Sequence, residues 1–231
     1  MLKALPGAQP APGWDVPAWR VGSLLVVEPG MGADLAAAVL PGLDAQGVSA
    51  LWLYGWCGGL SPELDAGDMA LADATVWHDA REAPIRHPPP DALQAQVRRL
   101  AEKLGLRLVV GAVLTSDRVL ASVADKQAGA AAGAVAVEME AGPLARWAVE
   151  RDVPFVHLRV VIDPAGSALP VIHSPADSHR RAPAYALVWH MLTHVRQWPA
   201  FWRLVRQART AQKAMTQVIA ALTGPDGPLS V

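Results

Sequence analysis

The stretch AVAVEMEAGPLARWAVERDVPFVHLRVVIDPA, residues 134–165, predicts a strand, a helix and a second strand. Ala134–Val137 is a short apolar run, and Val153–Ile162 is a longer one that is rich in β-branched residues. Between them, Ala141–Arg151 has apolar residues at helical spacing, and Pro143 falls in the first turn, where its missing N–H is tolerated. Strands that are apolar on both faces are typical of a buried sheet covered by helices.

Acidic residues follow both of these strands. Glu138 and Glu140 come directly after the first strand, and Asp163 ends the second. Ligands of open α/β sheets bind at the carboxyl ends of the strands, so we expect these three carboxylates at one site. The alternative is structural: the acids cap helices or form ion pairs with Arg159 and Arg151.

From Val21 to Asp163 the chain alternates between expected strands and helices, which favours an α/β fold. Residues 1–20 are rich in Pro and Gly and are expected to be irregular, so a single domain spans residues 21–231. The further strands expected are Val21–Val27, Val48–Tyr54, Met69–Ala74 and Leu106–Leu114. The further helices expected are Ala33–Gln46 with a bend at Pro41, Asp91–Leu104 with Asp91 and Gly105 as caps, Arg118–Gln127, and a C-terminal helical extension at about 185–222.

Composition narrows the class of protein. A chain of 231 residues fits one domain or at most two, and a hydrophobic fraction of 52% supports a sizeable core. The net charge of −1 gives no indication of a nucleic-acid partner. The single cysteine, Cys57, excludes an internal disulfide and suits a reducing cytoplasm, and we expect it to be a buried filler. We expect neither a signal peptide nor a membrane span, and therefore a cytoplasmic protein.

Two glycine-rich stretches precede the central one. Residues 55–68 follow the pattern GxxGGLxPxLxxGD, and residues 28–32, EPGMG, form a turn before an Ala-rich helix. In the 28–32 turn, glycines allow a ligand to approach the backbone closely at a helix N-terminus. An ordinary strand–helix turn is the alternative at residues 28–32.

Together with TSD at 115–117, VEMEA at 137–141 and RVVID at 159–163, these stretches resemble the nucleoside phosphorylase/nucleosidase superfamily. VEMEA is close to bacterial methylthioadenosine/adenosylhomocysteine nucleosidases. LRVVIDPAGSALP, residues 158–170, is more similar to hopanoid-associated phosphorylases, which remove adenine from adenosylhopane. The resemblance implies a three-layer α/β/α sandwich around a central mixed, twisted sheet that closes partly into a barrel.

The same resemblance implies a role for individual residues. Asp163 would be the catalytic acid that protonates purine N7, and burial would suit it to this by raising its pKa. Glu140 would accept hydrogen bonds from the ribose hydroxyls, and Met139 would pack on the ribose face. The other implied binding residues are Gly58 against the base or sugar, Val119 stacked on the base, Leu120 with its backbone groups toward the purine, and Gly30 and Gly32 in a candidate phosphate or sugar loop.

The sequence also departs from the family pattern. Phosphorolytic members place a Ser or Thr hydroxyl beside the glycine turn, whereas this chain carries Leu53 and Trp56 there. The family's N-terminal loop carries a Glu or Arg that helps to position the nucleophile, and no counterpart is evident. Phosphate is therefore an optional co-substrate, and no other cofactor is expected. His78 and His87 lack metal-ligand spacing, so we expect a solvated loop and no metal.

Three functions remain open. The first is release of adenine from a 5′-substituted adenosine such as adenosylhopane, by phosphorolysis or hydrolysis. The second is a methylthioadenosine/adenosylhomocysteine nucleosidase, and the third is a catalytically silent nucleoside-binding relative. The expected partners are a nucleoside and further copies of the chain, with a dimer favoured.

Two C-terminal segments also have alternative interpretations. The basic, Trp-rich helix is interpreted as a core or oligomer-packing helix, and peripheral contact with the inner membrane is the alternative. The polar stretch Ala165–Ala184 is either a lid over the site or a disordered connection.

Overall fold

The computed structural model describes residues 7–77, 83–169, 198–224 and 227–229. The chain begins with a small antiparallel sheet of β1 (Gln9–Pro10), β2 (Ala18–Val21) and β3 (Leu24–Val27). The two-residue turn between β2 and β3 begins at Gly22, whose φ of 56° is the left-handed conformation that such hairpins need. The structure therefore differs from the irregular segment predicted for residues 1–20, because the Pro- and Gly-rich composition concealed a short hairpin.

The main sheet is mixed and closes on itself. Its strands are β4 (Leu51–Gly59), β5 (Met69–Trp77), β6 (Ile85–Arg86), β7 (Leu108–Thr115), β8 (Ala134–Glu138) and β9 (Phe155–Asp163), in the order β6-β5-β7-β8-β4-β9. A further antiparallel pairing of β5 with β9 joins the two sides of the sheet. The predicted central mixed sheet and its partial closure into a barrel are both confirmed.

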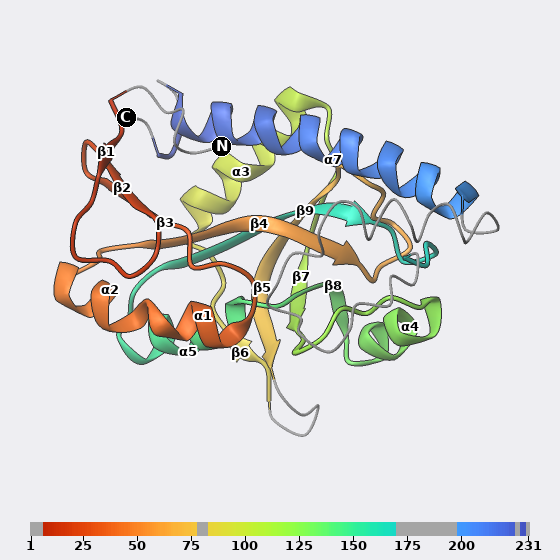
Figure 1. Cartoon of the computed structure of the whole chain (residues 1–231), viewed down its shortest axis with the longest axis horizontal. Coiled ribbons are helices and arrows are strands. Elements are labelled where there is room, and N and C mark those ends of the chain that lie inside the picture. Colours follow the sequence, from red (N-terminus) through yellow and green to blue (C-terminus); the bar gives the residue numbers. More distant parts are fainter. Residues whose placement is uncertain (1–6, 78–82, 170–197, 225–226, 230–231) are drawn as a thin grey trace.

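Helices cover both faces of this sheet, as Figure 1 shows. The helices α3 (Asp91–Leu104) and α7 (Trp198–Thr223) lie on one side. On the other side are α1 (Ala33–Ala38), α2 (Leu40–Gln46), α4 (Val123–Ala131) and α5 (Ala141–Glu150). The predicted three layers are therefore present. The predicted bend at Pro41 is a break between α1 and α2, with the proline in the first turn of α2.

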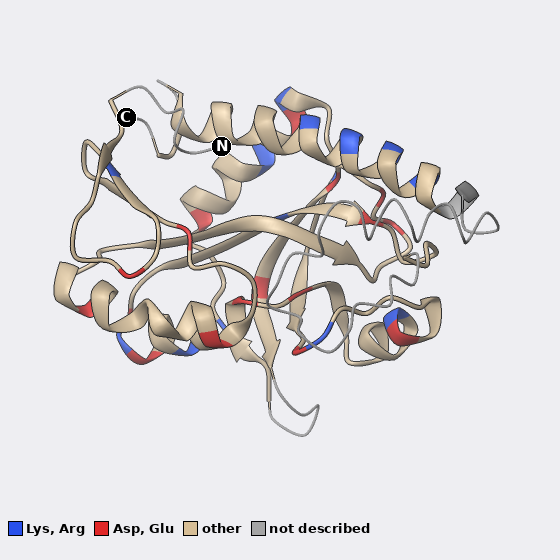
Figure 2. Cartoon of the chain, viewed as in Figure 1, with Lys and Arg blue, Asp and Glu red and all other residues tan. Residues whose placement is uncertain are grey.

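Helix α7 packs on the sheet through one apolar face. Ala211, Ala214 and Met215 are buried against Val160 of β9. Its basic residues are exposed, and Figure 2 shows them spaced along the helix: Arg203, Arg206, Arg209 and Lys213. Of the two packing roles predicted for this helix, the structure shows the packing on the core, with a basic outer face. No described helix is both long and apolar enough to cross a membrane. The expected polar stretch beyond Leu169 and the expected helix at 185–197 lie outside the described residues.

Three strand ends converge at Gly58. The antiparallel strands β4 and β8 pair only near their carboxyl ends, where Gly58 lies opposite Val137. Gly58 is also the partner of Asp163 at the end of β9. Because the carboxyl ends of β4, β8 and β9 meet at this point, the acidic residues that follow β8 and β9 lie close together.

Candidate active site

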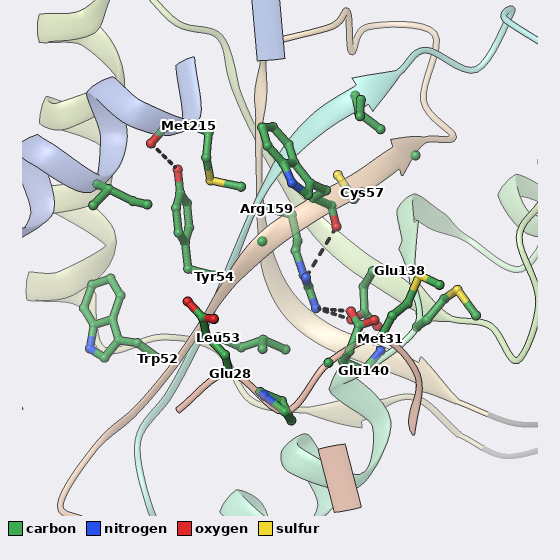
Figure 3. A pocket seen from close by; sticks show the side chains of 18 of the residues that line it. Glu28, Met31, Trp52, Leu53, Tyr54, Cys57, Glu138, Glu140, Arg159 and Met215 are labelled. Atoms are coloured by element: carbon green, nitrogen blue, oxygen red, sulfur yellow. Dashed lines mark hydrogen bonds and ion pairs between the residues drawn. The ribbon is translucent and has the colours of Figure 1, made fainter. Parts of the chain in front are cut away.

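A pocket of about 830 Å³ lies where these strand ends converge. The residues at its polar end come from the end of β8 and from β9: Glu138, Met139, Glu140, Arg159 and Asp163. Figure 3 shows that the pocket continues along β4 toward α7, past Trp52, Tyr54 and Met215. The lining of this second part, which we call the apolar arm, is Leu24, Leu25, Val26, Trp52, Leu53, Tyr54, Met215, Ile219 and Leu222.

Glu138 is fixed by its surroundings. Its carboxylate accepts hydrogen bonds from the Thr115 hydroxyl at 2.6 Å and from the backbone N–H groups of Glu140 and Ala141, both at 2.9 Å. The guanidinium of Arg159 forms an ion pair with it. Burial raises the pKa of Glu138, whereas the neighbouring Arg159 lowers it. Glu138 therefore caps the start of α5 and forms an ion pair, which is the structural alternative that the sequence left open.

Glu140 shares the same arginine but faces the pocket. Arg159 Nη2 lies 3.1 Å from Glu140 Oε2, so a single guanidinium bridges two carboxylates, as Figure 3 shows. The backbone N–H of Gly32 donates to Glu140 Oε1 at 3.1 Å. The side chain of Glu140 is 14% exposed, compared with 1% for Glu138, so Glu140 is the carboxylate that is open to a ligand. The second expected arginine partner, Arg151, instead pairs with Asp44.

The bridging arginine depends on a glycine in β4. A Cβ at Gly55 would overlap Nη1 of Arg159, so only glycine leaves room for the guanidinium. We expect Gly55→Ala to displace Arg159 and to lower the free energy of unfolding by about 1–3 kcal/mol, as overpacking does. Urea unfolding measures this loss. The matched control is Gly166→Ala, where a Cβ meets open space, and equal stability of the two variants would contradict the prediction.

Asp163 is held by a lysine that the sequence did not point to. Asp163 is buried, and its Oδ2 lies 2.5 Å from Nζ of Lys126 on α4, whose side chain is 1% exposed. Burial raises the pKa of Asp163 above its ordinary value, while the Lys126 ammonium opposes this rise. A lysine in an Ala-rich helix usually lies on the solvent-exposed face. The burial of Lys126 can therefore be inferred only from its ion pair with Asp163 at the end of β9.

The structure brings nearly all the other predicted site residues to the pocket wall. Met139, Gly58 and Gly30 line it, as do the exposed Val119 and the buried Leu120. A Cβ at Gly58 would lie 3.1 Å from Val137, which is a tight contact, and 3.5 Å from both carboxylate oxygens of Asp163, which is an ordinary one, so the neighbour that makes glycine favourable here is Val137 of β8. Gly32 reaches the site only through its N–H bond to Glu140.

Glu28 is a pocket residue that the sequence analysis overlooked. It follows β3, and Figure 3 places it beside Leu53. The signal that could have identified it was the position of the EPGMG turn directly after a strand.

Cys57 and His87 are buried and have structural roles. Cys57 is buried, and burial raises the pKa of its thiol, which agrees with the predicted filler. The expectation of a solvated loop is wrong for His87: it is buried, its Nε2 lies 2.7 Å from the Thr75 hydroxyl, and burial lowers its pKa to about 4. His78 lies outside the described residues. Within the described part of the chain no group of side chains could hold a metal ion.

Comparisons with known proteins identify the family and the fold. Residues 4–185 match the family model described as the phosphorylase superfamily. Over 123 residues the chain is 30% identical to the 5′-methylthioadenosine/S-adenosylhomocysteine nucleosidase of Staphylococcus aureus, a region that covers 47% of this chain and 54% of that protein. The chain thus spans about half the length of the curated relatives it matches.

Solved structures share the fold at low sequence identity. A mutant of the Helicobacter pylori nucleosidase with 5′-methylthioadenosine in its active site has a TM-score of 0.64 and 18% identity, and the match covers 92% of this chain and 88% of that one. The native futalosine hydrolase of Helicobacter pylori has a TM-score of 0.62 and 20% identity, and that match covers 92% and 86%.

Proposed function

The chain belongs to the phosphorylase superfamily, and from this premise we propose that it releases adenine from an adenosine with a large apolar 5′ substituent, for which adenosylhopane is the favoured example. The observation that carries this proposal is the apolar arm. It continues the pocket beyond the carboxylates, between β4 and α7, and it offers few polar partners to a ligand. A long hydrocarbon gains free energy from leaving water for such a surface, at roughly 25 cal/mol per Å².

The reaction follows from the placement of the two ligand-facing acids. The O–H bond of protonated Asp163 breaks as its proton passes to purine N7, and the electrons of the C1′–N9 bond leave with the base. Glu140 accepts hydrogen bonds from the ribose hydroxyls and supports the positive charge that develops on the sugar. A nucleophile then bonds to C1′, and the proton that it releases restores the acid.

We propose water as this nucleophile. Among the described residues that line the pocket, both guanidinium groups are engaged: Arg159 with Glu138 and Glu140, and Arg118 with Asp125 at 2.8 Å. The N–H of Gly32, in the candidate phosphate loop, already donates to Glu140. A phosphate would have to break these contacts to find a cation, whereas water needs none.

The test is adenine release from adenosines with 5′-alkylthio groups of increasing length, from methyl through butyl to decyl, and from adenosylhopane. We expect kcat/KM to rise with chain length and to be the same with and without phosphate. Release that requires phosphate would overturn the choice of water and identify a phosphorylase. No release from any of these nucleosides, together with binding of them, would overturn the enzyme and favour a silent relative.

The apolar arm predicts a length-dependent effect of Trp52→Ala. Losing the indole should raise KM for the decyl substrate about 10- to 100-fold, which corresponds to the 1.5–3 kcal/mol of one buried apolar side chain, and should leave KM for the methyl substrate nearly unchanged. Steady-state kinetics on both substrates measure the difference. Trp202→Ala is the matched control, because Trp202 is 56% exposed on α7. Equal changes for both substrates would count against the arm.

A methylthioadenosine/adenosylhomocysteine nucleosidase is the second candidate, because relatives at 30% identity carry that name. Its signature would be the highest kcat/KM on the methyl substrate and a decline with chain length.

A further inference from the structure

Lys126 and Glu138 are the two most deeply buried charged side chains among the described residues near the pocket. Lys126 lies in the middle of α4, and its side chain is 1% exposed. Its ammonium lies 2.5 Å from Asp163 Oδ2 and donates to the backbone carbonyls of Pro164 at 2.8 Å and Ser167 at 2.9 Å. A fourth, longer contact of 3.4 Å joins the ammonium to the backbone carbonyl of Asp163, so its three protons are fully occupied by these acceptors. Lys126 is therefore saturated and has no proton left for a substrate.

This contact holds one oxygen of Asp163 and leaves the other for the pocket. Oδ2 is engaged by Lys126, and no described residue forms a hydrogen bond with Oδ1, so Oδ1 is the oxygen that we assign to the base. The same ammonium ties the turn after β9 together through the two carbonyls. The side chain of Ser167, in that turn, lies 3.4 Å from Gln207 of α7. Lys126 of α4 thus holds both the Asp163 carboxylate and the turn after β9 that contacts α7.

We propose that Lys126 is the positioning residue of the catalytic acid: it orients the Asp163 carboxyl group and stabilises the carboxylate that remains after the proton has passed to the base. This inference rests on the proposed function. The effect is electrostatic as well as steric, because an ammonium at contact distance in a buried site favours the ionised form of its partner. Lys126 itself touches no substrate.

The other ionisable groups around the pair leave Lys126 as the nearest cation. The Cys57 thiol on β4 lies within the influence of both Lys126 and Asp163, and burial keeps it neutral. Glu138 and Arg159, on β8 and β9, are paired with each other. Among the groups that the structure describes, Lys126 is the one whose charge acts on the pKa of Asp163, and it lowers that pKa against the rise caused by burial.

Lys126→Met tests the proposal. An acid catalyst loses activity as pH rises through its pKa, and removing the cation raises that pKa. We therefore expect the alkaline limb of the kcat/KM profile to move up by about one to three pH units. Because the carboxylate that remains after proton transfer also loses its cation and its orientation, we expect kcat at neutral pH to fall at least about tenfold. Lys126→Arg, which keeps the charge, should hold the limb near the wild-type pH. Lys103→Met, at an exposed lysine of α3, is the matched control.

A second measurement needs no turnover. The carboxyl titration of Asp163, followed by NMR with ¹³C-labelled aspartate and assigned through Asp163→Asn, should move upward in Lys126→Met and stay in place in Lys126→Arg. The proposal would be overturned if the Asp163 titration were unchanged in Lys126→Met. It would also be overturned if this variant had a lower melting temperature but an unchanged alkaline limb of kcat/KM, because Lys126 would then be a merely structural residue. If the wild type cleaves no nucleoside, the proposed function falls and the titration alone decides whether Lys126 controls Asp163. If Lys126→Met does not fold, Lys126→Gln takes its place in both measurements.

Discussion

Asp163→Asn is expected to lower the rate of adenine release by about 10²–10⁴-fold, the usual contribution of a general acid. The amide has the size of the carboxyl group but no proton to give to purine N7. The protein should remain folded, because Lys126 keeps the carbonyls of Pro164 and Ser167 as acceptors. Adenine release under saturating substrate measures the loss, and circular dichroism verifies the fold.

The control for this variant is Asp91→Asn, which neutralises an exposed carboxyl group at the start of α3. It should retain the wild-type rate. A rate for Asp163→Asn within about twofold of the wild type would mean that another group protonates the base, and the role assigned to Asp163 would have to be given up.

Arg159→Met is expected to lower the free energy of unfolding by about 3–5 kcal/mol at neutral pH, because it leaves two carboxylates without the cation that they share. Glu138 is the more severely affected, since its side chain is only 1% exposed. The pH dependence follows from the pKa. Without Arg159 the folded-state pKa of Glu138 rises further above its unfolded value, so the folded protein binds a proton more tightly and the loss of stability is smallest at acid pH. Urea unfolding at several pH values measures both effects.

The double variant Arg159→Met with Glu138→Gln provides the internal check. Removing the buried negative charge together with its partner should recover much of the lost stability at neutral pH. If the double variant were as unstable as Arg159→Met alone, the arginine would act through packing and not through charge.

Where local chemistry decides, the sequence predicted the structure closely. Helix α3 begins at Asp91 and ends at Leu104 as expected, with Gly105 in the left-handed conformation at its end. One detail differs, since Pro90 and not Asp91 occupies the N-cap position. Strand β8, helix α5 and strand β9 also appear in the predicted order, because their apolar periodicities are strong and local.

Glycine misled the prediction in β4. Residues from Gly55 onward were expected to form a turn, yet the strand continues to Gly59. Two of these glycines make room for side chains of neighbouring strands: Gly55 for Arg159 of β9 and Gly58 for Val137 of β8. Nothing in the local sequence distinguishes a glycine that makes room from a glycine that turns the chain.

Long-range partners account for what the sequence could not give at the site. Lys126 is predictable as buried only once the end of β9 is known to lie beside α4. The apolar arm likewise forms from residues of β4 and α7 that are far apart in sequence, and the hydroxyl of Tyr54 joins them by donating to the carbonyl of Met215 at 3.1 Å. The Glu138–Arg159 pair was recognised as an alternative, but its bridge to Glu140 depends on the register of β8 and β9.

The hydrogen bonds around Glu138 have a consequence for the timing of the proposed reaction. Its carboxylate is fixed by a hydroxyl, two backbone N–H groups and the guanidinium, and Arg159 in turn fixes Glu140. The Glu140 carboxylate, to which we assign the ribose, is thus oriented before a ligand arrives. When positive charge develops on the sugar, these groups need not rotate to meet it, so the site is preorganised and the reorganisation that water would require is avoided.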